Sequence, residues 1–243
     1  MKKIVFLFSL LFLTGVELTA QTAFRFGFQV SPNFTWLSNN ERNINGNGTN
    51  LGVKVGVIGE KFLGGQDKYL FTFGVGFAFN QGGTLQHDIG GDFWTNSLGE
   101  DDALRVLPDG VNLKYGIQYI EIPLGLKLRT QEFGYLRYFV EPVFTVGLRT
   151  QARGSVDGAG GISTEGIDIK EDVSFFNLSL GIGGGVEYSL GENLSLIGGL
   201  YYQGGFTDIS VDDGEQKAMG QPPVPEDSKA KLNSITIRIG VMF

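Results

Sequence analysis

The sequence predicts an all-β protein, an eight-stranded antiparallel up-and-down transmembrane barrel, and two observations lead to this prediction. The first is the final strand, where apolar side chains occupy every second position: Ile235, Ile237, Ile239, Val241 and Phe243. A strand sends alternate side chains to opposite faces, so one face here is continuously apolar. On a soluble edge strand this face would promote aggregation, whereas a closed barrel in lipid has no free edge.

The second observation is that short and long connections alternate. Short ones are expected at 64–66, near 131–134 and at 191–193, and long ones at 37–50, 81–110, 152–172 and 209–231. Outer-membrane barrels have short periplasmic turns and long extracellular loops. An even number of strands also returns both chain ends to the periplasmic side. The connection lengths therefore predict the same fold as the apolar stripe.

Period-two alternation predicts strands at 24–36, 51–62, 69–80, 111–129, 136–148, 174–190, 194–208 and 232–243. The first strand carries apolar residues at each alternate position from Phe24 to Trp36. In the fourth strand the apolar residues are odd-numbered up to Tyr119 and even-numbered from Ile120. One extra residue would produce this change of phase, so a β-bulge is expected near Tyr119 and Ile120.

A soluble eight-stranded barrel of the lipocalin kind is the main alternative. That fold would place the apolar stripe inside and a charged stripe outside. Here the second stripe consists of Gly, Ser, Thr and Gln with scattered charges, which is too few charges for a solvated exterior. Tyr and Phe also gather near the strand ends, as the aromatic girdles of membrane barrels do. We therefore favour the membrane barrel.

The N-terminus has the features of a secretory signal peptide. Lys2 and Lys3 precede an apolar run from Ile4 to Leu13, and a small residue, Ala20, lies at the expected cut. The run is shorter than the roughly 20 residues that a membrane-spanning helix needs. We expect residues 1–20 to be removed after Ala20, and residues 21–243 to form one barrel domain in the outer membrane.

Composition excludes several functional classes. The formal net charge is −7, which argues against nucleic acid as a partner because phosphate binding requires a basic surface. The chain has no cysteine, so it has neither disulfides nor thiolate metal sites. Gly181, Gly183 and Gly185 lack the strand-then-helix context of a nucleotide-binding loop. Their inward positions predict that they make room in a narrow lumen. No cofactor is expected.

Ten charged side chains are expected to point into the lumen. The basic ones are Arg25, Lys54, Lys127, Arg129, Arg137, Arg149 and Arg238, and the acidic ones are Glu121, Glu141 and Glu187. The lumen of an eight-stranded barrel is only wide enough for side chains, so these charges predict a packed salt-bridge plug. The alternative is a narrow path that prefers anions, because basic residues outnumber acidic ones in this set.

Two loop features were weighed as catalytic or metal sites. His87 beside Asp88 is the only imidazole-based acid–base pair, and without a serine partner we expect a solvated loop histidine and no enzyme. The acidic runs Glu100-Asp101-Asp102 and Asp212-Asp213 lack the ligand spacing of a calcium loop. They are expected to be solvated loop charge.

Several stretches resemble the PorT-like family of outer-membrane β-barrels found in Bacteroidota-type envelopes. They include Phe26-Gly-Phe-Gln-Val-Ser-Pro-Asn-Phe34, Tyr119-Ile-Glu-Ile-Pro-Leu-Gly-Leu-Lys127 and Gly181-Ile-Gly-Gly-Gly-Val-Glu-Tyr188. The Tyr-Ile-Glu-Ile-Pro motif is the most specific of them. The resemblance implies an eight-stranded barrel in the outer membrane, with no catalytic residues, and some relatives act in protein secretion. The terminal Phe243 resembles the family's assembly signal.

Three functional hypotheses follow. The first is a non-enzymatic envelope component, structural, interacting or secretion-associated, that sits in outer-membrane lipid after insertion by the barrel-assembly machinery. It would engage another envelope protein through loops 37–50, 81–110, 152–172 and 209–231. The second is a small-solute, anion-preferring pore. The third, a loop-borne hydrolase, would require His87 to be essential for a measured activity.

Overall fold

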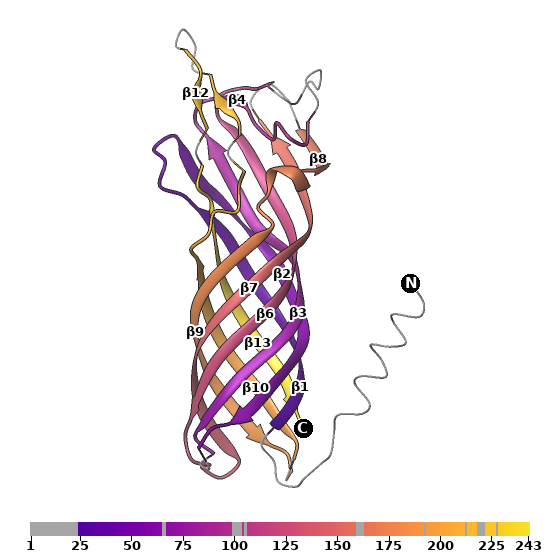
Figure 1. Cartoon of the computed structure of the whole chain (residues 1–243), viewed down its shortest axis with the longest axis vertical. Coiled ribbons are helices and arrows are strands. Elements are labelled where there is room, and N and C mark those ends of the chain that lie inside the picture. Colours follow the sequence, from indigo (N-terminus) through magenta and orange to yellow (C-terminus); the bar gives the residue numbers. More distant parts are fainter. Residues whose placement is uncertain are drawn as a thin grey trace, which may run out of the picture.

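Eight long strands form a closed antiparallel barrel in the computed structural model (Figure 1). The structure describes residues 24–64, 67–98, 104, 106–158, 163–191, 193–211, 213–217, 222–226 and 228–243, and the expected signal peptide lies outside these ranges. The barrel strands are β1 (Phe24–Ser38), β2 (Ile44–Phe62), β3 (Tyr69–His87), β6 (Val111–Arg129), β7 (Leu136–Asp157), β9 (Phe176–Ser189), β10 (Ser195–Gly205) and β13 (Lys231–Met242). Each strand pairs with the next, and β1 pairs with β13 to close the ring. The predicted fold is confirmed.

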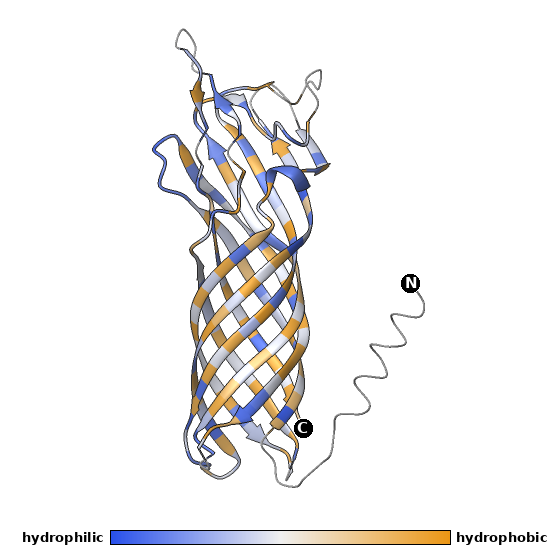
Figure 2. Cartoon of the chain, viewed as in Figure 1, coloured by the Kyte–Doolittle hydropathy of each residue, from blue (hydrophilic) through white to orange (hydrophobic). Residues whose placement is uncertain are grey.

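The lower part of the barrel is apolar outside and polar inside. Phe28, Leu200 and Ile239 are each more than half exposed on the outer wall, at 60%, 59% and 58%. Orange bands recur along the lower strands in Figure 2, and short turns connect neighbouring strands at this end. These large apolar side chains remain exposed because they face lipid in the membrane. The closed ring also meets the other requirement of a membrane span, since its strands pair their backbone groups with one another. Among the described residues, no helix has the length and hydrophobicity that a membrane crossing requires.

Strands β2, β3 and β7 continue beyond the belt into segments that the sequence predicted as loops. Residues 44–50, 81–87 and 152–157 are strand, and β8 (Ser163–Asp168) pairs with the upper part of β7. The prediction missed them because it assumed apolar side chains on the outside throughout. Above the membrane water surrounds the barrel, so the apolar side chains turn inward and the outer face becomes polar.

Strand β6 shows this inversion. The strand register does shift beside Tyr119, but the prediction that the extra residue lies in this strand is wrong. Odd-numbered residues of β6 face the interior along its whole length, so Val111, Leu113, Tyr115, Ile117 and Tyr119 are buried rather than in contact with lipid. The extra residues lie in the neighbouring strands. One falls between Ala78 and Gln81 of β3, and the other is Thr150 of β7. Along β6, the surroundings of the outer face change from water above Tyr119 to lipid below it, and this change moves the apolar side chains from the inner to the outer face.

The extracellular end is closed by the loops that follow β3 and β10. Short strands in these loops, β4 (Gly91–Asp92), β5 (Val106–Leu107), β11 (Glu215–Gln216) and β12 (Val224–Pro225), form a four-stranded sheet. The 3₁₀ helix η1 (Lys170–Asp172) adds Asp172, whose carboxylate accepts hydrogen bonds from the backbone N–H groups of Asn96 and Ser97 at 3.0 and 2.8 Å.

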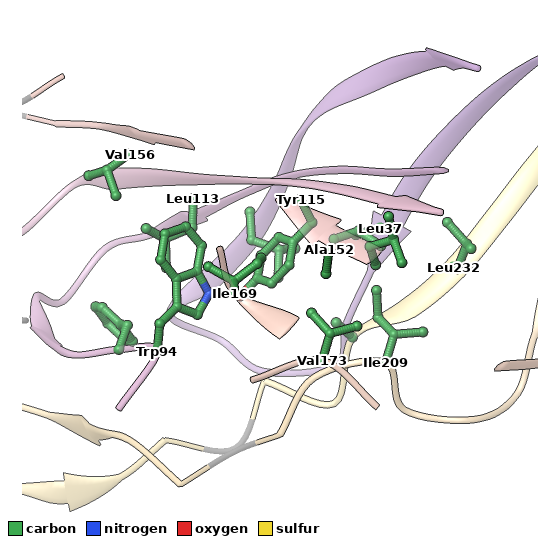
Figure 3. Packing of buried hydrophobic residues seen from close by; sticks show 14 of the residues in the cluster. Leu37, Trp94, Leu113, Tyr115, Ala152, Val156, Ile169, Val173, Ile209 and Leu232 are labelled. Carbon is green, nitrogen blue, oxygen red and sulfur yellow. Dashed lines mark hydrogen bonds between the residues drawn. The ribbon is translucent and has the colours of Figure 1, made fainter. Parts of the chain in front are cut away.

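An apolar core lies between these loops and the upper barrel strands (Figure 3). Trp94 is 5% exposed, packs at a right angle on Tyr115 with ring centroids 5.6 Å apart, and donates its indole N–H to the Tyr115 hydroxyl at 3.1 Å. Ile169 and Ile209 are fully buried in the same cluster. The upper barrel is therefore packed like a water-soluble domain.

We expect the folded protein to migrate faster in SDS gels when unboiled than when boiled. A closed ring resists the detergent because all of its strand hydrogen bonds are internal. Densitometry of samples heated to increasing temperatures would give the melting midpoint. Equal migration of boiled and unboiled samples, together with a helical circular dichroism spectrum, would contradict the barrel.

Candidate functional site: the charged lumen

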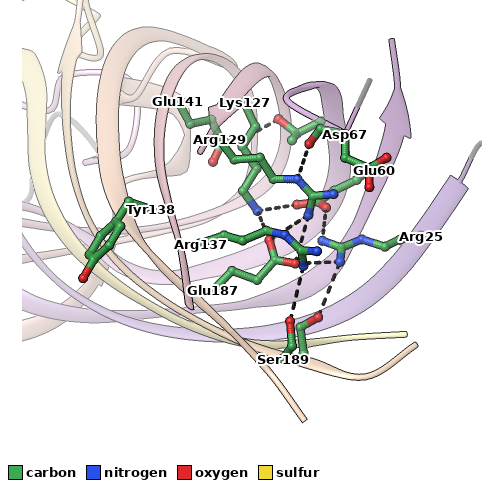
Figure 4. Close-up of polar contacts among 12 residues, drawn as sticks. Arg25, Glu60, Asp67, Lys127, Arg129, Arg137, Tyr138, Glu141, Glu187 and Ser189 are labelled. Atoms are coloured by element: carbon green, nitrogen blue, oxygen red, sulfur yellow. Dashed lines mark hydrogen bonds and ion pairs between the residues drawn. The ribbon is translucent and has the colours of Figure 1, made fainter. Parts of the chain in front are cut away.

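Two buried carboxylates organise the periplasmic end of the lumen (Figure 4). Glu60 of β2 contacts Arg25 and Lys127, each at 2.6 Å. Glu187 of β9 contacts Arg25 at 2.6 Å, Arg129 at 3.1 Å and Lys127 at 3.5 Å. Both acids are at most 2% exposed. The network joins strands from opposite sides of the ring and fills the interior with paired charge.

A second cluster surrounds Glu141 of β7, one level higher. Its carboxylate accepts hydrogen bonds from Thr72 at 2.6 Å, from Arg238 at 2.8 Å and from the Tyr201 hydroxyl. The Arg238 guanidinium also lies 3.8 Å from the centre of the Tyr201 ring, a cation–π geometry. Four strands, β3, β7, β10 and β13, contribute to this cluster.

Gly183 makes the second cluster possible. It lies directly across from Tyr201 in the pairing of β9 with β10, and a Cβ built on it would lie 2.0 Å from that ring. Any larger residue would push the Tyr201 hydroxyl away from Glu141. Glycine at this position thus makes room in the narrow lumen, as the sequence predicted for the 181–185 segment.

The third group is the ion pair between Lys54 and Glu121, 2.9 Å apart, with Gln203 accepting a further hydrogen bond from Lys54 at 3.2 Å. Above it the apolar core begins. The cavity beside this pair has a volume of about 30 Å³, and a second one next to Glu60 and Glu141 has about 10 Å³. A water molecule needs roughly 10–15 Å³, so each cavity holds one or two waters at most.

Two of the ten predicted lumen residues lie apart from these groups. Arg137 pairs with Glu132 in the periplasmic turn at 2.5 Å and donates to Ser189 at 3.3 Å. Arg149 sits where the lumen becomes apolar, close to the bulge at Thr150. In the described part of the chain, the Nε and Nη1 atoms of Arg149 and the Tyr119 hydroxyl are buried without a hydrogen-bond partner.

The sequence analysis missed Glu60, the acid that bridges two of the basic residues. Glu60 has the same parity as Lys54, so continuing the inward face of the second strand for six more residues would have found it. With Glu60 included, and with Glu132 as the partner of Arg137, the seven basic residues face five acids, Glu60, Glu121, Glu132, Glu141 and Glu187. The excess of basic charge behind the anion path therefore falls from four to two. Thr72, Tyr201 and Gln203 were also missed, because polar residues of an inner face are common and carry no distinctive spacing.

His87 is not the solvated loop residue that the sequence predicted. It ends β3, is 1% exposed, and its ring centroid lies 4.3 Å from that of Phe93. The prediction failed because β3 was expected to stop at Asn80. No group of three or more metal-binding side chains occurs among the described residues. Glu100, Asp101, Asp102 and Asp212 lie outside the described ranges, so the structure does not place these acidic runs.

Removing the carboxylate of Glu141 should destabilise the barrel. In Glu141→Ala, the buried Arg238 guanidinium and the Thr72 and Tyr201 hydroxyls lose their shared acceptor. Leaving buried polar groups unpaired costs about 1–3 kcal/mol, so the gel-shift melting midpoint should fall. Glu41→Ala, which removes an exposed acid from the first extracellular loop, is the control and should melt like the wild type. Identical melting of both variants would mean that the cluster contributes nothing to stability.

Comparison with known proteins places the chain among membrane barrels. No curated protein is similar enough in sequence to count as a relative. Among solved structures, Neisserial surface protein A aligns with a TM-score of 0.45 and 11% identity, over 91% of this chain and 98% of that chain. OprG from Pseudomonas aeruginosa gives 0.42 and 9%, over 92% and 96%. The outer membrane protease OmpT from Escherichia coli gives 0.41 and 8%, over 93% and 99%.

The family model described as the outer membrane protein beta-barrel domain matches residues 19–211. The chain thus belongs to this outer-membrane β-barrel family, which places it in the outer membrane.

Proposed function

We propose that the protein is a non-enzymatic, closed outer-membrane barrel that serves the cell envelope as a structural or interaction component. One observation carries this proposal, namely that the interior is filled along its whole length. The Glu60–Glu187 network, the Glu141 cluster and the Lys54–Glu121 pair follow one another upward, and the apolar core around Trp94 lies above them. Among the described residues, side chains packed at each of these levels block a continuous water path.

Single-channel recording in planar bilayers tests the closed barrel. The wild type should show no reproducible openings. The second candidate function, the anion-preferring pore, loses support because most basic residues of the lumen are paired with acids. Repeated anion-selective openings, altered in Lys54→Ala, would overturn the closed barrel in favour of the pore. Glu41→Ala, outside the lumen, should record like the wild type in either case.

In an interaction role, the protein would contact its partner through the extracellular loops or through the periplasmic turns. The resemblance to the PorT-like family supports an envelope partner, including a component of protein secretion. Crosslinking in native envelopes, followed by purification of the barrel, would test this role. A specific protein partner should be recovered repeatedly with the wild type. Recovery of the barrel alone, under crosslinking that captures known envelope complexes, would contradict the interaction role.

Export and insertion are the final parts of the proposal. A signal peptide removed after Ala20 would deliver the chain to the periplasm, and mass determination of the mature protein would test the cleavage site.

Phe243 is proposed as the signal to the assembly machinery. Its backbone exchanges hydrogen bonds with Phe26 at 2.8 and 3.0 Å, and its half-exposed ring lies 5.9 Å from Phe28. Deleting Phe243 should reduce the amount of heat-modifiable protein in outer-membrane fractions. Truncation removes a backbone pair at the β1–β13 seam as well as the ring, whereas Phe243→Ala removes the ring alone. A similar loss of insertion in Phe243→Ala would assign the signal to the aromatic ring. Normal insertion of both variants would mean that another segment carries the signal.

A further inference from the structure

The outer wall of the extracellular extension carries a polar cavity of about 450 Å³ that the closed lumen does not explain. Its lining comes from five neighbouring strands, β2, β3, β6, β7 and β8, and consists almost entirely of polar side chains. We propose that this cavity binds a saccharide, either the sugar chain of an outer-leaflet glycolipid or a soluble oligosaccharide. This inference goes beyond the proposed closed-barrel role, and its failure would leave that role intact.

The strand register arranges the lining in two parallel rows. In one row Thr84, Lys114, Ser155 and Glu165 lie directly opposite one another across β3, β6, β7 and β8. In the next row Asn112 lies opposite Asp157, and Asp157 opposite Ser163. With strands about 4.8 Å apart, the first row extends over about 14 Å. The lining thus extends mainly in one direction, which suits an extended chain better than a compact ligand.

These side chains point outward because their chain neighbours fill the core. Leu85, Leu113 and Val156 are each at most 1% exposed, and they immediately adjoin Thr84, Lys114 and Ser155. Asn47 donates to Asn112 at 2.7 Å at the end of the second row. The side chains of Lys114, Asp157 and Glu165 are exposed and line the cavity. The packed core holds their backbone in place, so the exposed polar groups start from set positions and are available to a ligand.

The chemistry of the lining selects a saccharide over other ligands. Carboxylates accept hydrogen bonds from hydroxyl groups, an ammonium donates to them, and amides and serine hydroxyls do both, so neighbouring sugar hydroxyls find partners of either kind. Two carboxylates, Asp157 and Glu165, face one ammonium, Lys114, and this balance disfavours a ligand rich in phosphate or sulfate. A peptide would need apolar subsites, and among the described residues of the lining Val156 alone is apolar.

The height of the cavity agrees with a sugar ligand. On β6, the outward-facing positions change from the apolar Ile120 to Lys114 over six residues. At about 3.3 Å per residue and a strand tilt near 40°, Lys114 lies roughly 15 Å above Ile120. Phospholipid headgroups extend only about 5–8 Å beyond the hydrocarbon core. At this level the barrel wall faces the sugars of outer-leaflet glycolipids or the external solution.

Two probes test the site and separate the two sources. The first is the soluble core oligosaccharide released from rough-type lipopolysaccharide and then dephosphorylated, with binding followed by saturation-transfer NMR on the barrel in phospholipid nanodiscs. The second is intact rough-type lipopolysaccharide in the nanodisc bilayer, detected by co-purification with the barrel and native mass spectrometry. Binding of the soluble probe would assign the site to free oligosaccharides as well, whereas retention of the intact glycolipid alone would assign it to the membrane source. Either result supports the proposal.

Variants show whether the cavity is where binding occurs. Lys114→Ala and Asp157→Ala should each weaken binding by about tenfold or more, the effect of losing one hydrogen bond to a charged group. Glu171→Ala removes an exposed acid outside the cavity and should bind like the wild type. All variants should keep wild-type heat modifiability, because these side chains are exposed or half-exposed. If neither probe binds, or if the cavity variants bind as well as the wild type, the proposal is overturned.

Discussion

Replacing Glu187 with alanine is expected to lower the free energy of unfolding by about 3–5 kcal/mol, the largest effect of any single lumen substitution. The reason is that Glu187 is fully buried and contacts Arg25, Lys127 and Arg129. Without it Glu60 alone must balance three cations in a space that water cannot enter freely. Urea unfolding in lipid vesicles, followed by tryptophan fluorescence, would measure the loss, and the gel-shift midpoint should fall in parallel.

Glu187→Gln separates charge from packing. Glutamine keeps the size of the side chain and one oxygen acceptor, so a loss close to that of alanine would assign the effect to charge. Glu41→Ala should unfold like the wild type, because that acid is exposed. In the double variant Glu187→Ala and Arg129→Met, one unpaired cation is removed, and part of the stability should return. Wild-type stability of Glu187→Ala would show that the charges are solvated and that the lumen is not a packed plug.

Replacing Trp94 with alanine should loosen the extracellular core while the membrane barrel stays folded. Removing a buried tryptophan costs about 3–5 kcal/mol, because a cavity remains where the ring packed. Trp94 also loses its hydrogen bond to Tyr115 and its contacts around Gly154. The substitution thus weakens the packing of the extracellular loops on the upper strands and leaves the contacts within the membrane barrel unchanged. We therefore expect rapid trypsin cleavage at extracellular sites such as Lys170, with heat modifiability retained.

Trp36→Ala is the matched control, since it makes the same change on the outer wall, where Trp36 lies 6.3 Å from Tyr202. Trypsin resistance of the extracellular part should persist in this variant. If Trp94→Ala instead lowers the gel-shift midpoint as much as Glu187→Ala does, the extracellular core and the membrane barrel unfold as one unit. Unchanged trypsin resistance of Trp94→Ala would mean that the core does not hold the loops in place.

The sequence by itself determined the membrane barrel, because lipid imposes a local rule. Every second residue of a lipid-facing strand must be apolar, and residues such as Phe28, Leu200 and Ile239 report this rule without knowledge of their neighbours. The inward parity of the lumen charges followed from the same alternation. The limits of β6, 111–129, were also predicted correctly.

Only the tertiary structure decided what surrounds each strand above the membrane and which charges meet. At Tyr119 and Ile120 the surroundings of β6 change from water to lipid, and the apolar side chains move from the inner to the outer face. A bulge would produce the same change in the sequence pattern, so alternation alone cannot distinguish the two. The partners of Glu187 are 58 to 162 residues away along the chain, so their contacts depend on ring closure and strand stagger. The polar cavity likewise exists only through the register that places Lys114 between Thr84 and Ser155.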